Sequence, residues 1–406
     1  MSCSSNPETA RKSNKTDNGQ MPLGVVLMLA GLAALAPLGT DIYLPAVPAM
    51  AADFDAALHD IEISISCFLI GIAFGQLFGG PLSDRYGRRK MVIFGLIMFG
   101  FATALLAFNN SVPHLWILRV IQALGAGFAA VSGMAMIRDL SHGSDGAINM
   151  MRVVQIMMIA PLIAPLLGML VLEVTGSWQA IFLFLLLYSI AILARFIATM
   201  PESNPHRDAD ASLLGRYKTV ITDRRVWPYL GFVSGTYAGM FGFITSSPTV
   251  YMDYFGVSST WYPFAFGANV VGMVTMAKLN IVMLKHFKPL QLIRAGQAVQ
   301  LTAVSLMVIY LLALDRHSIT VLLPLTVVFM SCHGFVMANS VASVTGIHAR
   351  NAGTATALMN ATGFTVGALS GITAGVMSDG TPLPMATVML AGAVVGVLSH
   401  VLHGRR

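Results

Sequence analysis

The stretch Gly80-Pro-Leu-Ser-Asp-Arg-Tyr-Gly-Arg-Arg-Lys90 is a short basic turn between two long apolar segments. Its four cations and its one carboxylate cannot lie in hydrocarbon, so the turn marks a boundary between membrane and water. Short loops rich in Lys and Arg remain on the cytoplasmic side of a membrane. The turn is therefore expected in the cytoplasm, and it orients the helices before and after it.

The composition of the whole chain is that of a membrane protein. Of its 406 residues, 56% are hydrophobic and only 10% are charged, whereas a soluble domain carries about 25% charged residues. The net charge of +6 comes from cations in loops, which favours a cytoplasmic-loop bias over a nucleic-acid partner. The three cysteines suggest neither a disulfide framework nor a metal site. The polar first twenty residues lead into a full-length span, so no cleavable signal peptide is expected.

Apolar runs of about twenty residues predict twelve membrane-spanning helices. Their expected bounds are 22–45, 62–82, 91–109, 113–137, 149–172, 178–200, 227–250, 261–284, 291–314, 319–343, 352–377 and 383–403. An even number places both termini on the cytoplasmic side. The expected fold class is therefore an all-α membrane protein.

Loop charges agree with this topology. The expected outer loops hold one cation, Arg316, and a set of acids: Asp53, Asp55, Asp60, Glu62, Glu173, Asp253, Asp315 and Asp379. Nearly all other cations lie in the expected inner loops and tails, as positive-inside bias requires. An odd number of spans would invert half of the chain and destroy this separation.

The longest polar interruption, 201–226, divides the chain into two halves of six expected spans. The expected organisation is a cytoplasmic polar tail (1–21), an N-terminal six-helix bundle (22–200), this cytoplasmic linker and a C-terminal six-helix bundle (227–406). A weak parallel repeat of six plus six spans is the organisation of one large class of transporters.

Two charges lie clearly inside the expected spans, Asp41 in the first and Arg119 in the fourth. At about 1.5 Å per residue both lie roughly 10 Å below the outer surface, where they could pair. One interpretation is a structural ion pair between helices. The other is a protonation switch, because small movements of a cation beside a buried acid load or release a proton. Gln122, one turn from Arg119, could join this network.

Candidate pocket residues carry less specific signals. Flexible thioethers and aromatic rings suit a pocket for varied apolar compounds, although they suit helix packing equally. The candidate substrate-binding residues are Tyr43, Gln155, Met158, Tyr237, Phe241, Phe266 and Asn269. Lys278 is interpreted as a cation that extends to the inner interface, and His333 as hydrogen-bonded packing, with a substrate or proton role left open for both.

The fifth expected span contains two prolines four residues apart, Pro161 and Pro165, followed by Gly168. The prolines remove backbone donors and the glycine allows close helix approach, which favours a deliberate bend over a generic kink. No phosphate-binding loop, HExxH or Gly-x-Ser-x-Gly motif occurs, so no enzyme, metal or cofactor is expected.

These motifs together resemble those of a known family. Gly80–Arg89 resembles motif A of the major facilitator superfamily, Arg119–Gly127 resembles motif B, and Ala164–Gly168 resembles motif C, the antiporter signature. Asp41–Met50 and the segment from Ser247 to Asn269 resemble the Bcr/CflA drug exporters, the bicyclomycin and chloramphenicol resistance type. The resemblance covers the chain after its first twenty residues.

The resemblance implies a proton-coupled exporter that works by alternating access of two bundles. It implies that Asp41 takes the proton, with Arg119 and Gln122 as its partners, and that Pro161, Pro165 and Gly168 form the antiporter helix. It implies a cytoplasmic latch made of Gly80, Asp84, Arg85, Gly87, Arg88 and Asp139. In that latch Arg88 meets Asp139, and Asp84 faces the helix start near Ala352 and Gly353.

The leading hypothesis is a drug/proton antiporter for small amphipathic antibiotics in the inner membrane, acting as a monomer. Its partners are a small molecule, protons and lipid, with no nucleic acid. An alternative is an exporter of a native metabolite or siderophore with incidental drug resistance. A membrane enzyme would need paired catalytic groups at one depth, and a receptor would need a larger soluble segment. The sequence does not separate the substrates or fix the proton stoichiometry.

Overall fold

The computed structural model describes residues 21–141, 143–204 and 213–404. Within these residues every regular element is a helix. The elements of the first half are α1 (Leu23–Asp41), η2 (Leu44–Ala46), α2 (Val47–Asp53), α3 (Leu58–Tyr86), α4 (Arg88–Ala107), α5 (Val112–Leu140), α6 (Gly143–Met157), α7 (Ala160–Thr175) and α8 (Gln179–Thr199). They are followed by α9 (Leu213–Ile221), α10 (Trp227–Pro248), η3 (Thr249–Tyr254), α11 (Tyr262–Met283), α12 (Pro289–Ala313), α13 (Ile319–Ser331), α14 (His333–Ile347), η4 (Ala349–Asn351), α15 (Ala352–Val376) and α16 (Leu383–Gly404).

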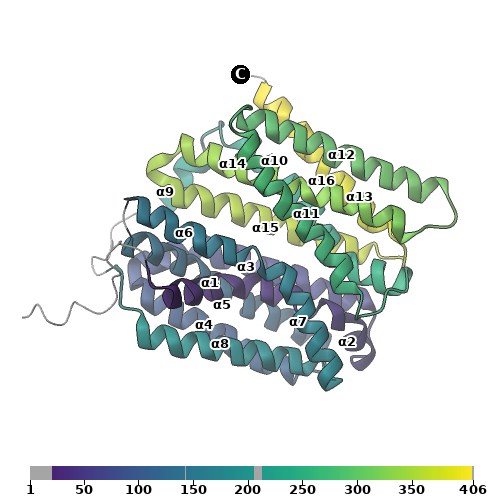
Figure 1. The fold of residues 1–406 in the computed structure, drawn as a ribbon, viewed down its shortest axis with the longest axis horizontal. Helices are drawn as coiled ribbons and strands as arrows, with labels where there is room; N and C mark the ends of the chain where they lie inside the picture. The colour runs from purple at the N-terminus through teal and green to yellow at the C-terminus, as the bar shows by residue number, and fades with distance from the viewer. Residues whose placement is uncertain (1–20, 142, 205–212, 405–406) are drawn as a thin grey trace, which may run out of the picture.

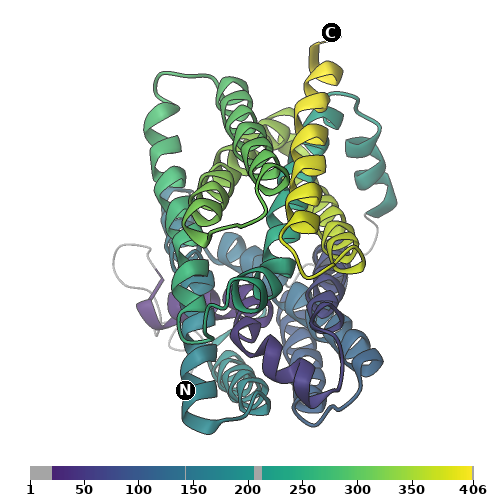
Figure 2. The same cartoon turned by 90° about the vertical axis from the view of Figure 1, so that its right-hand side faces the viewer.

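The helices form two bundles that lie side by side, α1–α8 in one and α10–α16 in the other (Figures 1 and 2). Within the first bundle α5 packs against α3 and α4, and within the second α10 packs against α15 and α16. Three pairings join the bundles: α3 contacts α15 and α10, and α7 contacts α11. Helix α9, between the bundles in the chain, also packs on α15. The interface between the bundles therefore runs through α3, α10 and α15.

Each of the twelve expected spans corresponds to helix, but three of them are broken. The first ends at Asp41 and continues as η2 and α2, the fifth divides at residues 158–159, and the tenth divides at Cys332. Pro45 and Pro161, in the first turns of η2 and α7, explain two of these breaks because proline favours the start of a helix and cannot continue one.

Ten helical stretches of the described chain are long and apolar enough to cross a membrane. Helices α10 and α15 are long enough but do not reach that apolarity. Both lie between other helices, where Gly, Ser and Thr permit close packing and lipid does not demand large apolar side chains. The chain is a multi-pass membrane protein, and the number of twelve spans stays a prediction.

The expected polar linker contains a helix. In α9, Tyr217 donates a hydrogen bond of 2.7 Å to the carbonyl of Leu77 in α3. Pro81, four residues after Leu77, has no N–H, so that carbonyl lacks its usual helical donor. The linker thus completes a hydrogen bond of the first bundle, while α9 also contacts α15 of the second. Residues 205–212 of the linker and residues 1–20 of the expected tail lie outside the described residues.

One expected loop acid is placed differently. Glu62 is not in an outer loop, because α3 begins at Leu58 and buries the Glu62 side chain to 1% exposure. The extra turn of α3 has Asp60 at its third position, where the carboxylate accepts the backbone N–H of Ala57 at 3.3 Å. The prediction of a solvated loop at this position was therefore wrong.

Candidate functional site

Asp41 is the last residue of α1, and its side chain is 4% exposed. The hydroxyl of Thr40 donates to the carbonyls of Ala36 and Pro37, each at 3.1 Å, and the next helical segment, η2, has Pro45 in its first turn. An acid at the C-terminal end of a helix faces the negative end of its dipole. The local fold therefore presents a buried carboxyl at a site that disfavours an isolated negative charge.

Arg119, on α5, lies with its guanidinium between two rings, 4.5 Å from the centre of Tyr43 and 4.4 Å from the centre of Phe68. It is fully buried and donates a hydrogen bond of 2.6 Å to Gln122, which donates in turn to Thr103 at 2.8 Å. The contact expected between Arg119 and Gln122 is thus present. The stacked rings hold the guanidinium through cation–π attraction, which strengthens in desolvated sites.

No ion pair joins Arg119 to Asp41 in the described residues, although the two charges interact electrostatically. The Nε and one terminal nitrogen of Arg119 have no hydrogen-bond acceptor. Buried, unpaired guanidinium N–H groups are costly, so they favour binding of an acceptor. The arrangement can therefore take up a polar group of a ligand, or approach Asp41 if α1 and α5 shift.

Gly168, on α7, lies directly against the backbone at this helix end. A methyl group at Gly168 would overlap the carbonyl oxygen of Ile42, the residue after Asp41. The glycine of the Pro161–Gly168 segment thus lets α7 approach the break in the first span. Pro161 stands in the first turn of α7 and Pro165 inside it, after the break at residues 158–159.

The candidate substrate residues of the second bundle fall into two aromatic groups. Tyr237 and Phe241 contact each other and Phe364, with ring centres 5.3 to 5.8 Å apart. Phe266 stacks on Phe243 at 6.2 Å, while Asn269, one turn further on, has an unpartnered side-chain oxygen. All four predicted residues are buried. Phe364 was missed because it lies on α15, which carries no aromatic pattern.

The remaining pocket candidates belong to the first bundle. Tyr43 is fully buried and shares a hydrogen bond of 2.7 Å with Ser64. Gln155 is exposed on α6, and Met158 is half-buried at the α6–α7 break. The structure brings Tyr43 together with Arg119, whose guanidinium lies 4.5 Å from the centre of the Tyr43 ring.

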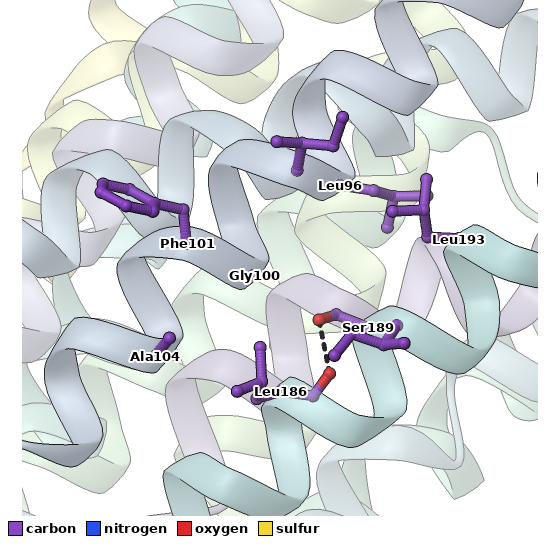
Figure 3. Close-up of a pocket in the computed structure, with 9 residues that line it drawn as sticks. Leu96, Gly100, Phe101, Ala104, Leu186, Ser189 and Leu193 are labelled. Atoms are coloured by element: carbon purple, nitrogen blue, oxygen red, sulfur yellow. Dashed lines mark hydrogen bonds between the residues drawn. The ribbon is translucent and has the colours of Figure 1, made fainter.

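A cavity of about 300 Å³ lies elsewhere, between α4 and α8 (Figure 3). It is lined by Leu96, Gly100, Phe101, Leu186, Ser189 and Leu193 among others, and the Ser189 hydroxyl bonds the carbonyl of Leu186 at 2.8 Å. Phe101 is 65% exposed on this face, as a lipid-facing side chain would be. The cavity contains none of the predicted site residues.

The basic turn forms a closed network at the end of α3. Arg88, at the start of α4, pairs with Asp84 of α3 at 3.1 Å. It also pairs with Asp139 of α5, which is the contact that the resemblance implies. Gly87 adopts φ of +102°, which glycine tolerates and which turns the chain from α3 into α4. Arg85 is exposed, over the ring of Tyr86 at 5.5 Å.

The Asp84 carboxylate pairs with Arg88 at the end of α3. At Gly353 of α15 the group nearest to an added methyl is the guanidinium of Arg138, at 3.7 Å. The expected placement of Asp84 near Ala352 and Gly353 stays a prediction. A methyl group added at Gly80 would lie 3.7 Å from the side chain of Val131, so Gly80 lies close to α5.

Glu202 completes this turn and was missed from the sequence. Its carboxylate accepts the backbone N–H groups of Arg88 at 2.9 Å and Arg89 at 3.2 Å, the first residues of α4. A carboxylate at a helix N-terminus satisfies free donors and complements the dipole. Glu202 lies 114 residues from Arg88 in the chain, so no local spacing predicts the contact.

The two polar residues left open are placed as packing would place them. His333 is buried on α14, with its Nδ1 at 3.3 Å from the hydroxyl of Thr236. Lys278 is exposed on α11. His333 therefore has a bonded neighbour in the core of the second bundle, and Lys278 faces outward.

An acid of the linker, Asp223, connects the linker to the second bundle. It accepts hydrogen bonds from Arg225 at 2.8 to 3.1 Å and lies 3.1 Å from the imidazole of His348. The hydrogen bonds from Arg225 lower the pKa of Asp223 from 3.8 to about 2. The stabilisation is therefore present above about pH 4 and is lost as pH falls through 2.

We expect the thermal stability of the wild-type protein in detergent to fall more steeply than that of Asp223→Asn between pH 4 and pH 2. The amide cannot titrate, so the variant loses nothing at this position in that range. Unfolding midpoints measured at half-unit pH steps check this. Parallel curves for the two proteins would show that the Asp223 cluster does not stabilise the folded chain.

Comparison with known proteins places this arrangement in a family. Residues 29–372 match the model of the Major Facilitator Superfamily. A bicyclomycin resistance protein homolog of Haemophilus influenzae is 28% identical over 92% of this chain and 94% of its own. A chloramphenicol resistance protein of Pseudomonas aeruginosa is 33% identical over 62% of this chain and 60% of its own.

The fold is also found among solved structures. A bacterial homolog of the human lysosomal transporter Spinster, in an inward-facing and unoccupied conformation, superposes with a TM-score of 0.72 at 14% identity. The match covers 96% of this chain and 97% of that one. The expected resemblance to the Bcr/CflA type is confirmed, and the chain belongs to the Major Facilitator Superfamily of membrane transporters.

Proposed function

We propose that the protein is a proton-coupled exporter of small amphipathic antibiotics in the bacterial inner membrane. Its relatives are named for bicyclomycin and chloramphenicol resistance, which supports drugs of that kind as substrates. The observation that carries the proposal is the buried carboxyl of Asp41 at a helix end, close to the stacked cation of Arg119. We propose twelve spans with both termini in the cytoplasm.

The mechanism is competition for one site. Drug enters from the cytoplasm or the inner leaflet and binds while Asp41 holds a proton. A bound drug changes the packing around Arg119, the cation moves toward the carboxyl, and Asp41 releases its proton. After outward opening a proton from outside restores Asp41 and the drug leaves. Arg119 has two unpartnered nitrogens, Nε and one terminal nitrogen, so one can donate to the drug while the other takes the Asp41 carboxylate.

The Arg88 network, with Asp84, Asp139 and Glu202, is the cytoplasmic latch in this cycle. It joins the ends of α3, α4 and α5 through charge-assisted bonds. We propose that it holds the first bundle as one rigid body while the bundles rock against each other. Export needs no cofactor or metal in this mechanism, because the proton gradient supplies the free energy.

The test is proton release when chloramphenicol or bicyclomycin is added to the purified protein in weakly buffered detergent solution. We expect the wild type to release a proton, and Asp41→Asn to bind the drug without release. Asp55→Asn is the matched control, because Asp55 is exposed and its φ of +48° suits asparagine. Drug binding without proton release in the wild type would overturn the mechanism.

A further inference from the structure

A second buried acid lies outside the site around Asp41. Glu62 is 1% exposed, and its Oε1 accepts the backbone N–H of Thr249 at 2.9 Å. Glu62 belongs to α3 and Thr249 opens η3 after α10, so this bond joins the two bundles. Thr249 directly follows Pro248, the last residue of α10, and its N–H is shared between the Glu62 carboxyl and the carbonyl of Ser246. Nothing in the mechanism above uses Glu62.

Hydroxyl groups without partners surround this contact. Ser66 lies one turn after Glu62 on α3, and Thr245 lies one turn before Thr249 on α10. The hydroxyl oxygens of Ser66 and Thr245 are buried and have no hydrogen-bond partner, and the buried hydroxyl of Thr249 lies beside the Glu62 carboxyl. A methyl group on Gly371 of α15 would meet the hydroxyls of both Ser66 and Thr245. Polar side chains of α3 and α10 thus lie close together at the interface where these two helices meet α15.

Such a cluster of polar side chains is costly while it stays closed and dry. Each buried hydroxyl without a partner has lost its hydrogen bonds to water and gained none in the protein. Separation of the bundles on the outer side would admit water to the hydroxyls and to Glu62 together. The interface is therefore built to be wetted during the cycle, which a purely structural contact between bundles does not require.

The charged surroundings of Glu62 contain no paired cation among the described residues. On its own helix His59 and Asp60 lie 3.6 Å from each other, and Asp253 of η3 lies within electrostatic range of Glu62. Arg119 of α5 contacts Phe68, six residues or about 9 Å further along α3.

The other elements that contact α3 add few ionisable groups. Helices α15 and α10 carry no charged residue, and α4 carries none from Met91 to Ala107. Helix α1 contributes Asp41, and Asp53 of α2 is bonded to Trp178 and Gln179. Among the described residues, therefore, no Lys, Arg or His forms an ion pair with Glu62 in this closed arrangement.

A hydroxyl pair connects the surroundings of Glu62 with those of Asp41. Tyr262 is fully buried, shares a hydrogen bond of 2.7 Å with Ser247, and lies within electrostatic range of both acids. Glu62 stands at the second turn of α3, near the outer end of the helix, while Asp41 lies deeper at the end of α1. The two carboxyls therefore lie one after the other on a path that a proton could follow from the outer solution.

We propose that Glu62 is the outer relay through which Asp41 exchanges its proton with the external solution. When the bundles part on the outer side, neutral Glu62 passes its proton to the Asp41 carboxylate along water that enters beside the unpartnered hydroxyls. Hydronium from the outer solution then protonates the Glu62 carboxylate and leaves water. On closure the neutral acid again accepts the Thr249 N–H and seals the route.

This inference rests on the proposed function, and its test separates the two. Glu62→Gln retains an oxygen that accepts the Thr249 N–H but cannot carry a proton. We expect the variant to exchange labelled chloramphenicol for unlabelled drug at the wild-type rate in proteoliposomes without a gradient. Transport driven by a pH gradient should fall about tenfold or more. Drug-triggered proton release in detergent, which reports Asp41, should remain.

Two further variants complete the design. Asp60→Asn makes the same acid-to-amide change on the same turn of α3 and should leave every rate unchanged. Glu62→Asp keeps an acid and should recover part of the driven transport that the amide loses. Wild-type driven transport in Glu62→Gln would overturn the relay, and so would loss of gradient-free exchange, since that loss marks a structural role. Absence of proton release in the wild type would instead contradict the proposed function, on which the relay rests.

Discussion

Replacement of Gly168 by alanine is expected to inactivate the transporter and to destabilise the folded protein. The added methyl overlaps the carbonyl oxygen of Ile42, and a backbone atom cannot move aside as a flexible side chain can. Either α7 moves away or the end of α1 shifts, and Asp41 shifts with it. Overpacking of this kind costs about 1–3 kcal/mol. Drug-triggered proton release should disappear at drug concentrations that saturate the wild type.

Gly346→Ala is the matched control for this prediction. Gly346 lies on α14, and an added methyl there meets nothing within 4 Å. Alanine at an unobstructed helical position stabilises by roughly 0.5–1 kcal/mol relative to glycine. The same substitution should therefore lower the unfolding midpoint at position 168 and raise it slightly at position 346. A Gly168→Ala protein with normal midpoint and transport would show that the α7 contact does not position Asp41.

The second large effect is expected from Arg119→Lys, although this change keeps the charge. The ammonium group of lysine has no planar face to stack between Tyr43 and Phe68, and it lacks the fork that bonds Gln122 while leaving other N–H groups free. Desolvated cation–π contacts contribute about 2 kcal/mol each. Transport driven by a pH gradient should fall about a hundredfold, a loss that corresponds to roughly 2.7 kcal/mol.

Transport in proteoliposomes and drug binding in detergent check this prediction together. Binding should weaken as well, because the unpartnered guanidinium N–H groups are the proposed donors to the drug. Arg316→Lys, an exposed position in the loop between α12 and α13, is the control and should transport normally. Normal transport by Arg119→Lys would mean that a point charge is sufficient and that the stacking is only structural.

Much of the fold was accessible from the sequence because a bilayer restricts a chain so strongly. Every backbone group in hydrocarbon must bond within its own helix, so apolar length alone predicts where helices lie. The Arg88–Asp139 contact follows from a family motif, and the Arg119–Gln122 bond from helical spacing. These contacts are local, or belong to a pattern that the sequence displays.

Contacts between distant segments were not accessible. Hydropathy assigned Glu62 to a loop because its turn is polar, yet packing against α10 buries it. Glu202 gives no signal of its own, since its partners lie more than a hundred residues earlier. The break after Asp41 was missed because the residues on both sides are equally apolar. In each case tertiary packing, rather than local preference, decides the outcome.

The bonds made by the linker have a consequence for dividing the protein. Glu202 and Tyr217 follow the first six expected spans in the chain, yet both complete hydrogen bonds of the first bundle. The segment that completes the first bundle therefore extends beyond the last of its six expected spans. If the two halves were produced as separate polypeptides, a first half that extends to Ile221 would keep both of these hydrogen-bonding residues. A division before Tyr217 would place Tyr217 on the other polypeptide, so that the first half would need the second to complete its hydrogen bonds.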